Sequence, residues 1–344
     1  MSAPRASYGL LLSMLSLVVV AVLGVLIGSA SIPVGDVLGI LAKALGFSIE
    51  PTWRPWAESV VLDIRLPRVV TGVCVGAALG LSGASLQGLF RNPLASPSVI
   101  GVSSGASLGA VLAIYFGLGA LFVWSIPLFA FIGAGVTTFT VYAIATHRGQ
   151  TPTGSLLLAG VAMSALNVAM SSFLLASAMS SWEAGRMILF WTMGGLEART
   201  WDHVLLVAPI VLLGAALILS YARDLDALLL GEVHAASVGV DVPQVRKLLI
   251  CATALITGAA VAVSGGIGFV GLVVPHILRI GFGPQHRWLL PASMCAGAAF
   301  LVAGDLAVRV LFEGKLIPLG VATASIGAPF FLYLLIRHRG ELRI

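Results

Sequence analysis

Residues 71–119 read TGVCVGAALGLSGASLQGLFRNPLASPSVIGVSSGASLGAVLAIYFGLG, and residues 258–283 read GAAVAVSGGIGFVGLVVPHILRIGFG. Both stretches are long and apolar, yet Gly, Ser, Asn, Pro and His interrupt them. Hydrocarbon offers no water to satisfy polar groups, so these residues indicate close helix packing and a lined interior and not a lipid-facing anchor. The two stretches therefore predict a membrane protein with a path through it.

The composition supports this prediction. Apolar residues make up 59% of the 344 residues and charged residues only 10%, and the mean hydropathy is +1.06, well above that of soluble domains. The net charge of +5 is small and scattered, so we expect membrane lipid and not nucleic acid around this chain.

Hydropathy and length predict an all-α integral membrane protein with about ten transmembrane helices in a single domain, residues 1–344. Each candidate stretch is close to the roughly 20 residues that a helix needs to cross a bilayer. The expected spans are residues 9–31, 65–89, 98–120, 124–146, 155–179, 203–222, 246–264, 267–282, 288–311 and 319–337.

The distribution of Lys and Arg predicts the orientation. An even number of spans returns the C-terminus to the side of Arg5, and the positive-inside rule then makes both termini cytoplasmic. The cations on that side are Arg91, Arg148, Arg223, Arg246, Lys247, Arg279, Arg287, Arg337 and Arg339. The outer side also carries cations, either because an acidic partner docks there or because arginines snorkel at helix ends. These are Arg54, Arg65, Arg68, Arg186, Arg199, Arg309 and Lys315.

The longest cytoplasmic insertion, residues 223–245, has helical apolar spacing that is interrupted at Gly231 and Gly239. It predicts two short amphipathic helices that lie flat and offer a surface to a partner.

The sequence lacks the motifs that nucleotide binding and metal binding require. The Gly314-Lys315 pair is followed by Leu316, so the chain has no phosphate-binding loop and we expect no enzyme activity. The isolated histidines His234 and His276 predict no metal site. Asp305 and Arg309 lie four residues apart, a spacing typical of an ion pair on one helix face, which favours a structural role.

Six motifs together resemble the FecCD family, the permease subunits of type II ABC importers for iron siderophores, haem and cobalamin. The resemblance runs from about residue 60 to the C-terminus. The motifs are RLPR (65–68), GAALGLSGASLQGLFRNPLASPSVIGVSSGA (76–106), LLLAGVA (156–162), FWTMGGL (190–196), LGE (230–232) and SGGIGFVGLVVPHILR (264–279).

The resemblance implies a homodimer in the bacterial inner membrane, with the passage on the dimer axis. It further implies two cytoplasmic ATPase subunits, which hold ATP and Mg, and a periplasmic substrate-binding protein. This chain itself is expected to bind no cofactor, and haem or another iron chelate is its cargo.

The same resemblance assigns roles to particular residues. Docking of the binding protein falls to Arg65, Arg68 and Arg309, and arginine suits this role because its planar fork holds carboxylates. ATPase coupling falls to residues 225–242, centred on Gly231, Glu232, Ala235 and Gly239. A cytoplasmic gate falls to Asn92, Leu94, Thr153 and Gly154.

The fifth expected span is the one that lines the passage in the family. Met163, Asn167, Met170, Ser171 and Leu174 recur at spacings of three or four and share one face that mixes soft apolar and small polar groups. Such a face suits a bulky cargo, because methionine adapts its shape. Ordinary helix packing explains the pattern equally well, so both interpretations stay open.

Haem is the first expected cargo, because FWTMGGLEARTW (190–201) and the Met-bearing span favour it, with siderophores and cobalamin close behind. An ion-coupled secondary transporter or a channel is the alternative from another class. Intramembrane acids and the absence of a coupling loop would favour that alternative, and this sequence shows the reverse.

Overall fold

The computed structural model describes residues 3–147, 151–179 and 181–337. Arg148 and Arg339, two of the cations used for the orientation, lie outside these ranges. Within them the chain is helical and no strand occurs. The elements are α1 (Ala3–Leu26), α2 (Val34–Ala44), α3 (Pro55–Ser59), η1 (Val60–Arg65), α4 (Leu66–Leu89), α5 (Val102–Tyr115), η2 (Leu118–Ala120), α6 (Ser125–Ala145), α7 (Thr153–Ala178), α8 (Trp182–Met193), α9 (Trp201–Ser220), α10 (Ala222–Leu229), α11 (Glu232–Ser237), α12 (Val242–Ser264), α13 (Val270–Phe282), α14 (His286–Leu311) and α15 (Leu319–Arg337).

The expected transmembrane helices are confirmed. Among the described residues, seven helical stretches are long and apolar enough to cross a membrane, and α5, α13 and α15 are shorter apolar helices at the three remaining expected spans. The main difference lies in α5, which covers residues 102–115 and not 98–120. Gly101 and Gly117 flank it with φ angles of 85° and 67°, a left-handed conformation that does not continue a right-handed helix.

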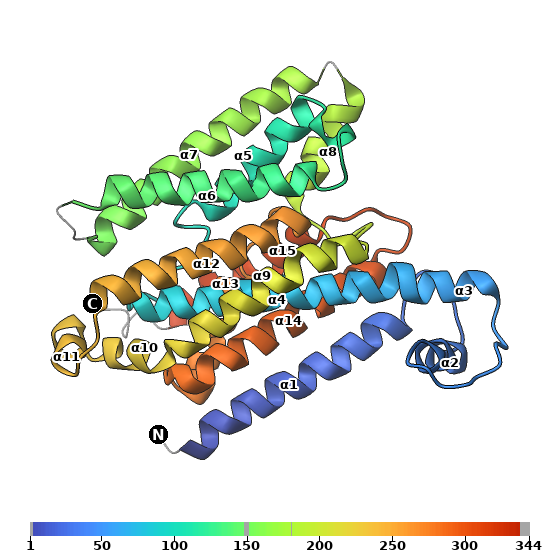
Figure 1. The fold of residues 1–344 in the computed structure, drawn as a ribbon, viewed down its shortest axis with the longest axis horizontal. Coiled ribbons are helices and arrows are strands. Elements are labelled where there is room, and N and C mark those ends of the chain that lie inside the picture. Colours follow the sequence, from blue (N-terminus) through green and yellow to red (C-terminus); the bar gives the residue numbers. More distant parts are fainter. Residues whose placement is uncertain (1–2, 148–150, 180, 338–344) are drawn as a thin grey trace.

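The helices form two groups (Figure 1). Helices α5 to α8 lie together, and α4 lies at the centre of the other group among α9, α12, α13 and α14. The stretch Pro55–Leu89, which comprises α3, η1 and α4, is the most buried of the long apolar stretches. Within its apolar window 83% of the residues are buried, against 17% for α7.

Glycines let α4 approach its neighbours closely. A Cβ atom at Gly76 would collide with the carbonyl oxygen of Gly297 on α14, and one at Gly83 would collide with that of Gly271 on α13. Small residues at such crossings bring backbones into contact, which is a main source of helix association in lipid.

The two ends of the bundle differ. Helices α2 and α3 lie at one end, and α10 and α11 lie at the other end (Figure 1). The expectation that both termini are cytoplasmic stays a prediction. The two short helices expected within residues 223–245 are confirmed, as α10 and α11.

Candidate functional site

At the end of α2 and α3, which we call the outer end after the orientation predicted from the charges, a buried carboxylate joins two arginines. Arg68 Nε lies 3.0 Å from Asp305 Oδ2, Arg68 Nη2 lies 2.6 Å from Oδ1, and Arg309 Nε lies 3.1 Å from Oδ2. The Asp305 side chain is only 3% exposed. The expected Asp305–Arg309 ion pair is thus confirmed, and Arg68 is a further partner that its distance in sequence concealed.

Arg65 binds the end of α1. Its side chain is buried and donates to the carbonyl oxygens of Val25, Leu26 and Ala30, the first two at 3.1 and 3.0 Å. These carbonyls belong to the C-terminal end of α1 and the turn after it, where helix carbonyls lack intrahelical partners. Arg65 therefore caps α1, which explains its burial without any docking partner. Arg309 shares this role, because its Nη1 donates to the carbonyl oxygens of Gly24 and Ile27 at 3.2 and 3.3 Å.

The outer cluster as a whole is still cationic. Arg199 is close enough to Glu197 and Arg68 to interact electrostatically with both, and Glu197 Oε1 lies 3.7 Å from Arg68 Nη2. Burial lowers the pKa of Arg199 and the neighbouring Glu197 opposes that shift. We name the outer cluster by its members: Arg65, Arg68, Arg199, Arg309, Glu197 and Asp305. Four arginines face two carboxylates, so an attraction for acidic groups remains a prediction for this end.

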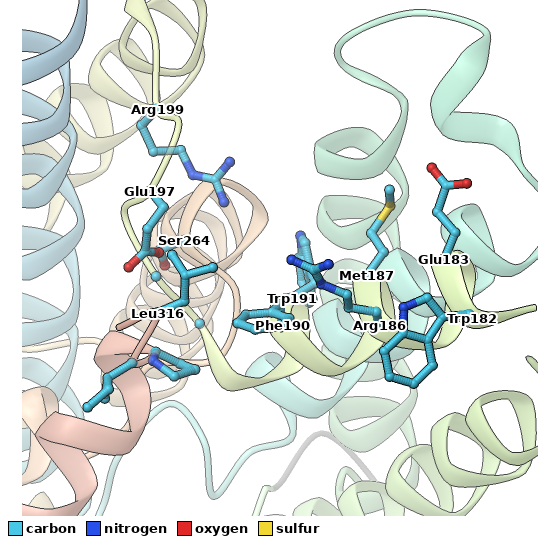
Figure 2. A pocket seen from close by; sticks show the side chains of 14 residues that line it. Trp182, Glu183, Arg186, Met187, Phe190, Trp191, Glu197, Arg199, Ser264 and Leu316 are labelled. Carbon is cyan, nitrogen blue, oxygen red and sulfur yellow. The ribbon is translucent and has the colours of Figure 1, made fainter. Parts of the chain in front are cut away.

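A cavity of about 740 Å³ opens beside the outer cluster. Figure 2 shows the side chains of α8 on one side of it, with Glu197, Arg199 and Leu316 on the other. The Arg186 guanidinium lies 5.6 Å from the centre of the Phe190 ring, a cation–π arrangement. Two arginines, Arg186 and Arg199, and two glutamates, Glu183 and Glu197, line the cavity together with aromatic rings, so its lining carries charges of both signs.

The structure divides the residues expected to line a passage. Asn167 is 4% exposed, and its Nδ2 donates to Thr137 Oγ1 at 3.0 Å and to Ser104 Oγ at 3.2 Å. Met163 packs against the core, and the hydroxyl of Ser171 is buried. Met170 is 45% exposed. This face of α7 thus packs mainly against α5 and α6, and only Met170 is freely accessible.

The opposite face of α7 is open along the whole helix. Its residues include both large apolar and small side chains, and all are exposed: Gly154, Leu158, Val161, Ala165, Val168, Ala169, Ser172 and Ala176. Sequence reasoning selected the other face because methionines marked it, whereas small residues are the signal that would have identified this one.

The expected gate residues lie in two separate places. Asn92 Oδ1 accepts from the Leu94 amide at 2.9 Å, which shapes the turn after α4. Leu94 lines a cavity with Ile267 and Phe269. Thr153 and Gly154 begin α7 instead, and Thr153 lines a different cavity. The two turns therefore line different cavities.

The expected coupling segment forms a compact surface at the end of α10 and α11, which we call the inner end after the predicted orientation. Gly231 has a φ of 110° and Gly239 a φ of 92°, so the two glycines bend the chain before and after α11. Ala235, within α11, is fully buried. On its outside the segment exposes Leu230, Val233 and Val238 by 71%, 87% and 59%. Glu232 is 50% exposed and pairs with Arg246 at 2.5 Å.

These features define a multi-pass, all-helical membrane permease with an arginine-rich cluster at one end and exposed apolar side chains around α11 at the other. The chain belongs to the FecCD transport family, whose model matches residues 16–337.

Individual relatives agree with this assignment. The cobalamin import system permease protein BtuC of Halobacterium salinarum is 48% identical over 86% of this chain and 77% of its own length. The hemin transport system permease protein HmuU of Yersinia pestis is 39% identical over 87% of this chain and 90% of its own. A solved inward-facing structure of a metal-chelate type ABC transporter is 33% identical, with a TM-score of 0.82 over 95% of this chain and 98% of that one.

Proposed function

We propose that this chain works as a homodimer in the cytoplasmic membrane, with the passage between the two copies of α7. The observation that carries the proposal is the open face of α7, because a second copy would cover it. The open face differs from a lipid-facing one. Helix α1 is also exposed, and its exposed side chains are large, such as Leu11, Leu15 and Val18. Helix α7 exposes small side chains as well as large ones, namely Ala165, Ala169 and Ser172. Lipid favours the first pattern and helix contact or a lined passage the second.

Energy for transport comes from two ATPase subunits that bind the coupling segment. The exposed Leu230, Val233 and Val238 are large apolar side chains at the inner end, where the positive-inside rule places the cytoplasm. Apolar side chains on short helices that lie outside the bundle fit a protein cleft. ATP and Mg belong to those subunits, and this chain performs no chemistry on them.

An acidic substrate-binding protein docks at the outer end. The outer cluster provides the attraction through its net positive charge, with Arg68 and Arg199 nearest to a partner, because Arg65 and Arg309 both donate to carbonyl oxygens at the end of α1. Electrostatic attraction of this kind mainly accelerates encounter and selects the partner.

The cargo is a bulky metal tetrapyrrole, and cobalamin is the first compound to test. The relative that is 48% identical, an importer of cobalamin by name, supports this choice. Haem is the second candidate, since the relative from Yersinia pestis is named for hemin and the α8 cavity combines aromatic rings with Arg186. The identity to the cobalamin relative thus outweighs the sequence features that favoured haem.

The test is uptake into proteoliposomes that contain this chain with its cognate ATPase inside and its binding protein outside. We expect ATP-dependent uptake of cyanocobalamin that exceeds uptake of hemin and of ferric dicitrate. Preference for hemin would make haem the cargo. Uptake that needs an ion gradient and no ATP would instead show an ion-coupled secondary transporter.

A further inference from the structure

The coupling segment is tied to the start of α7 through one side chain. Arg246, near the start of α12, donates from Nη2 to Glu232 Oε1 on α11 at 2.5 Å and from Nη1 to the carbonyl oxygen of Thr151 at 3.1 Å. Thr151 lies two residues before α7. A single planar guanidinium therefore joins α11, α12 and the turn that leads into α7.

The contact is sheltered, and space lies beside it. The Arg246 side chain is 13% exposed, so solvent weakens its ion pair less than it would weaken a surface pair. A cavity of about 370 Å³ adjoins the contact and is lined by Tyr142, Thr151, Thr153, Glu232 and Arg246. The space therefore adjoins the contact between Arg246 and Thr151 at the start of α7.

The neighbouring helix α10 is fixed to a different part of the molecule. Asp226 Oδ1 on α10 accepts from the backbone amide of His286 at 2.6 Å and lies 3.0 Å from its Nδ1, at the start of α14. Leu225 and Leu228 are buried beneath α10. Gly231, with its φ of 110°, separates this fixed helix from α11. The coupling segment therefore consists of an anchored half and a half that is tied to α7.

We infer that Arg246 is a positioning residue that passes movement of α11 to the start of α7. When a partner moves α11, Glu232 moves with it, and Arg246 carries the Thr151 carbonyl and the first turn of α7 in the same direction. Helix α10 stays with α14. The inference rests on the proposed function, because it needs an ATPase that moves α11 and a second copy across which α7 moves.

The test measures both ends of the link in the full complex. In a background with Cys74, Cys251 and Cys295 replaced by alanine, Ser155→Cys or Ser237→Cys carries a spin label in each copy, and the distance between the two copies is measured with and without ATP and vanadate. In otherwise wild-type protein we expect both distances to change. In Arg246→Met the Ser237 distance still changes and the Ser155 distance does not. ATP-driven uptake of cyanocobalamin falls at least tenfold, while ATP hydrolysis stays within twofold.

Two further variants separate positioning from structural damage. Lys247→Met removes the adjacent, exposed cation, and both distances change as before. Arg246→Lys keeps a charge for Glu232 and restores part of the Ser155 change and of the uptake. A Ser155 distance that changes normally in Arg246→Met overturns the inference. Absence of ATP hydrolysis and of both changes in otherwise wild-type protein overturns the proposed function itself, and the inference with it.

Discussion

Arg68 donates to the Asp305 carboxylate through two nitrogen atoms, Nε and Nη2, although the two residues are 237 positions apart in the sequence. The pair joins the start of α4 to the last turns of α14, and Arg309 approaches the same carboxylate from one helical turn further along α14. Asp305 is therefore the buried anion that neutralises two arginines at the outer end.

Removal of this carboxylate charge will destabilise the protein. Asp305→Asn leaves Arg68 and Arg309 without a full counter-charge, and breaking a buried ion pair in this way costs about 3–5 kcal/mol. We expect a clearly lower thermal midpoint for the purified protein in detergent. Glu197→Gln is the matched control, because Glu197 is 42% exposed and lies 3.7 Å from Arg68. Equal midpoints for the two variants would contradict the central role of Asp305.

Arg65 is expected to matter for stability and not for docking. Arg65→Met leaves the carbonyls of Val25, Leu26 and Ala30 without a donor. A buried polar group that loses its hydrogen-bond partner lowers the stability of the fold by roughly 1–3 kcal/mol. The thermal midpoint should fall, while the affinity of the folded fraction for the binding protein stays within about twofold of wild type. Loss of affinity with an unchanged midpoint would return Arg65 to the docking surface.

Docking at the outer cluster is tested by adding charge and not by breaking the cluster. Glu197→Lys makes the exposed edge more positive, so capture of an acidic binding protein should tighten severalfold at low salt, and the gain should vanish at high salt. Surface-immobilised transporter and soluble binding protein give the affinities. Unchanged capture at low salt would place the binding protein elsewhere.

The sequence predicts the fold well and the site only in part, for identifiable reasons. A bilayer demands long apolar helices, so hydropathy locates every span. Backbone conformation at Gly101 and Gly117 decides where α5 begins and ends, and spacing alone does not show it. The pair of Asp305 with Arg309 follows from an i, i+4 interval, whereas Arg68 reaches Asp305 only through the tertiary fold.

The two faces of α7 show the same limit. Periodicity correctly groups Met163, Asn167 and Met170 on one face, but whether that face packs or lines a passage depends on neighbouring helices. In the structure Asn167 bonds to Thr137 and Ser104. The capping by Arg65 and the link through Arg246 likewise use backbone carbonyls, which leave no mark in a side-chain pattern.

Asn167 is accordingly expected to hold α7 in place. Asn167→Ala removes the donor that joins α7 to Thr137 on α6 and Ser104 on α5, and a buried hydrogen-bond partner is worth roughly 1–3 kcal/mol. We expect a lower thermal midpoint.

Ala165→Trp, on the open face of α7, should instead leave the fold of each subunit intact and block uptake or prevent dimer formation. Size-exclusion chromatography with light scattering distinguishes these two outcomes. Normal uptake by a dimeric Ala165→Trp protein would exclude the open face from both roles.

The glycines of the coupling segment offer the sharpest test of where the ATPase binds. Gly231 has a φ of 110°, a conformation that a β-branched residue adopts only with strain of order 1–3 kcal/mol. Gly231→Val should therefore tilt α11, separate Glu232 from Arg246 and abolish copurification of the ATPase. Gly117→Val is the matched control, since Gly117 also has a positive φ, 67°, and open space for a side chain, but lies at the outer end. It should retain the ATPase at wild-type stoichiometry despite similar backbone strain. Loss of the ATPase from both variants would mean that strain anywhere in the bundle disrupts the complex, and retention by both would remove the coupling role from Gly231.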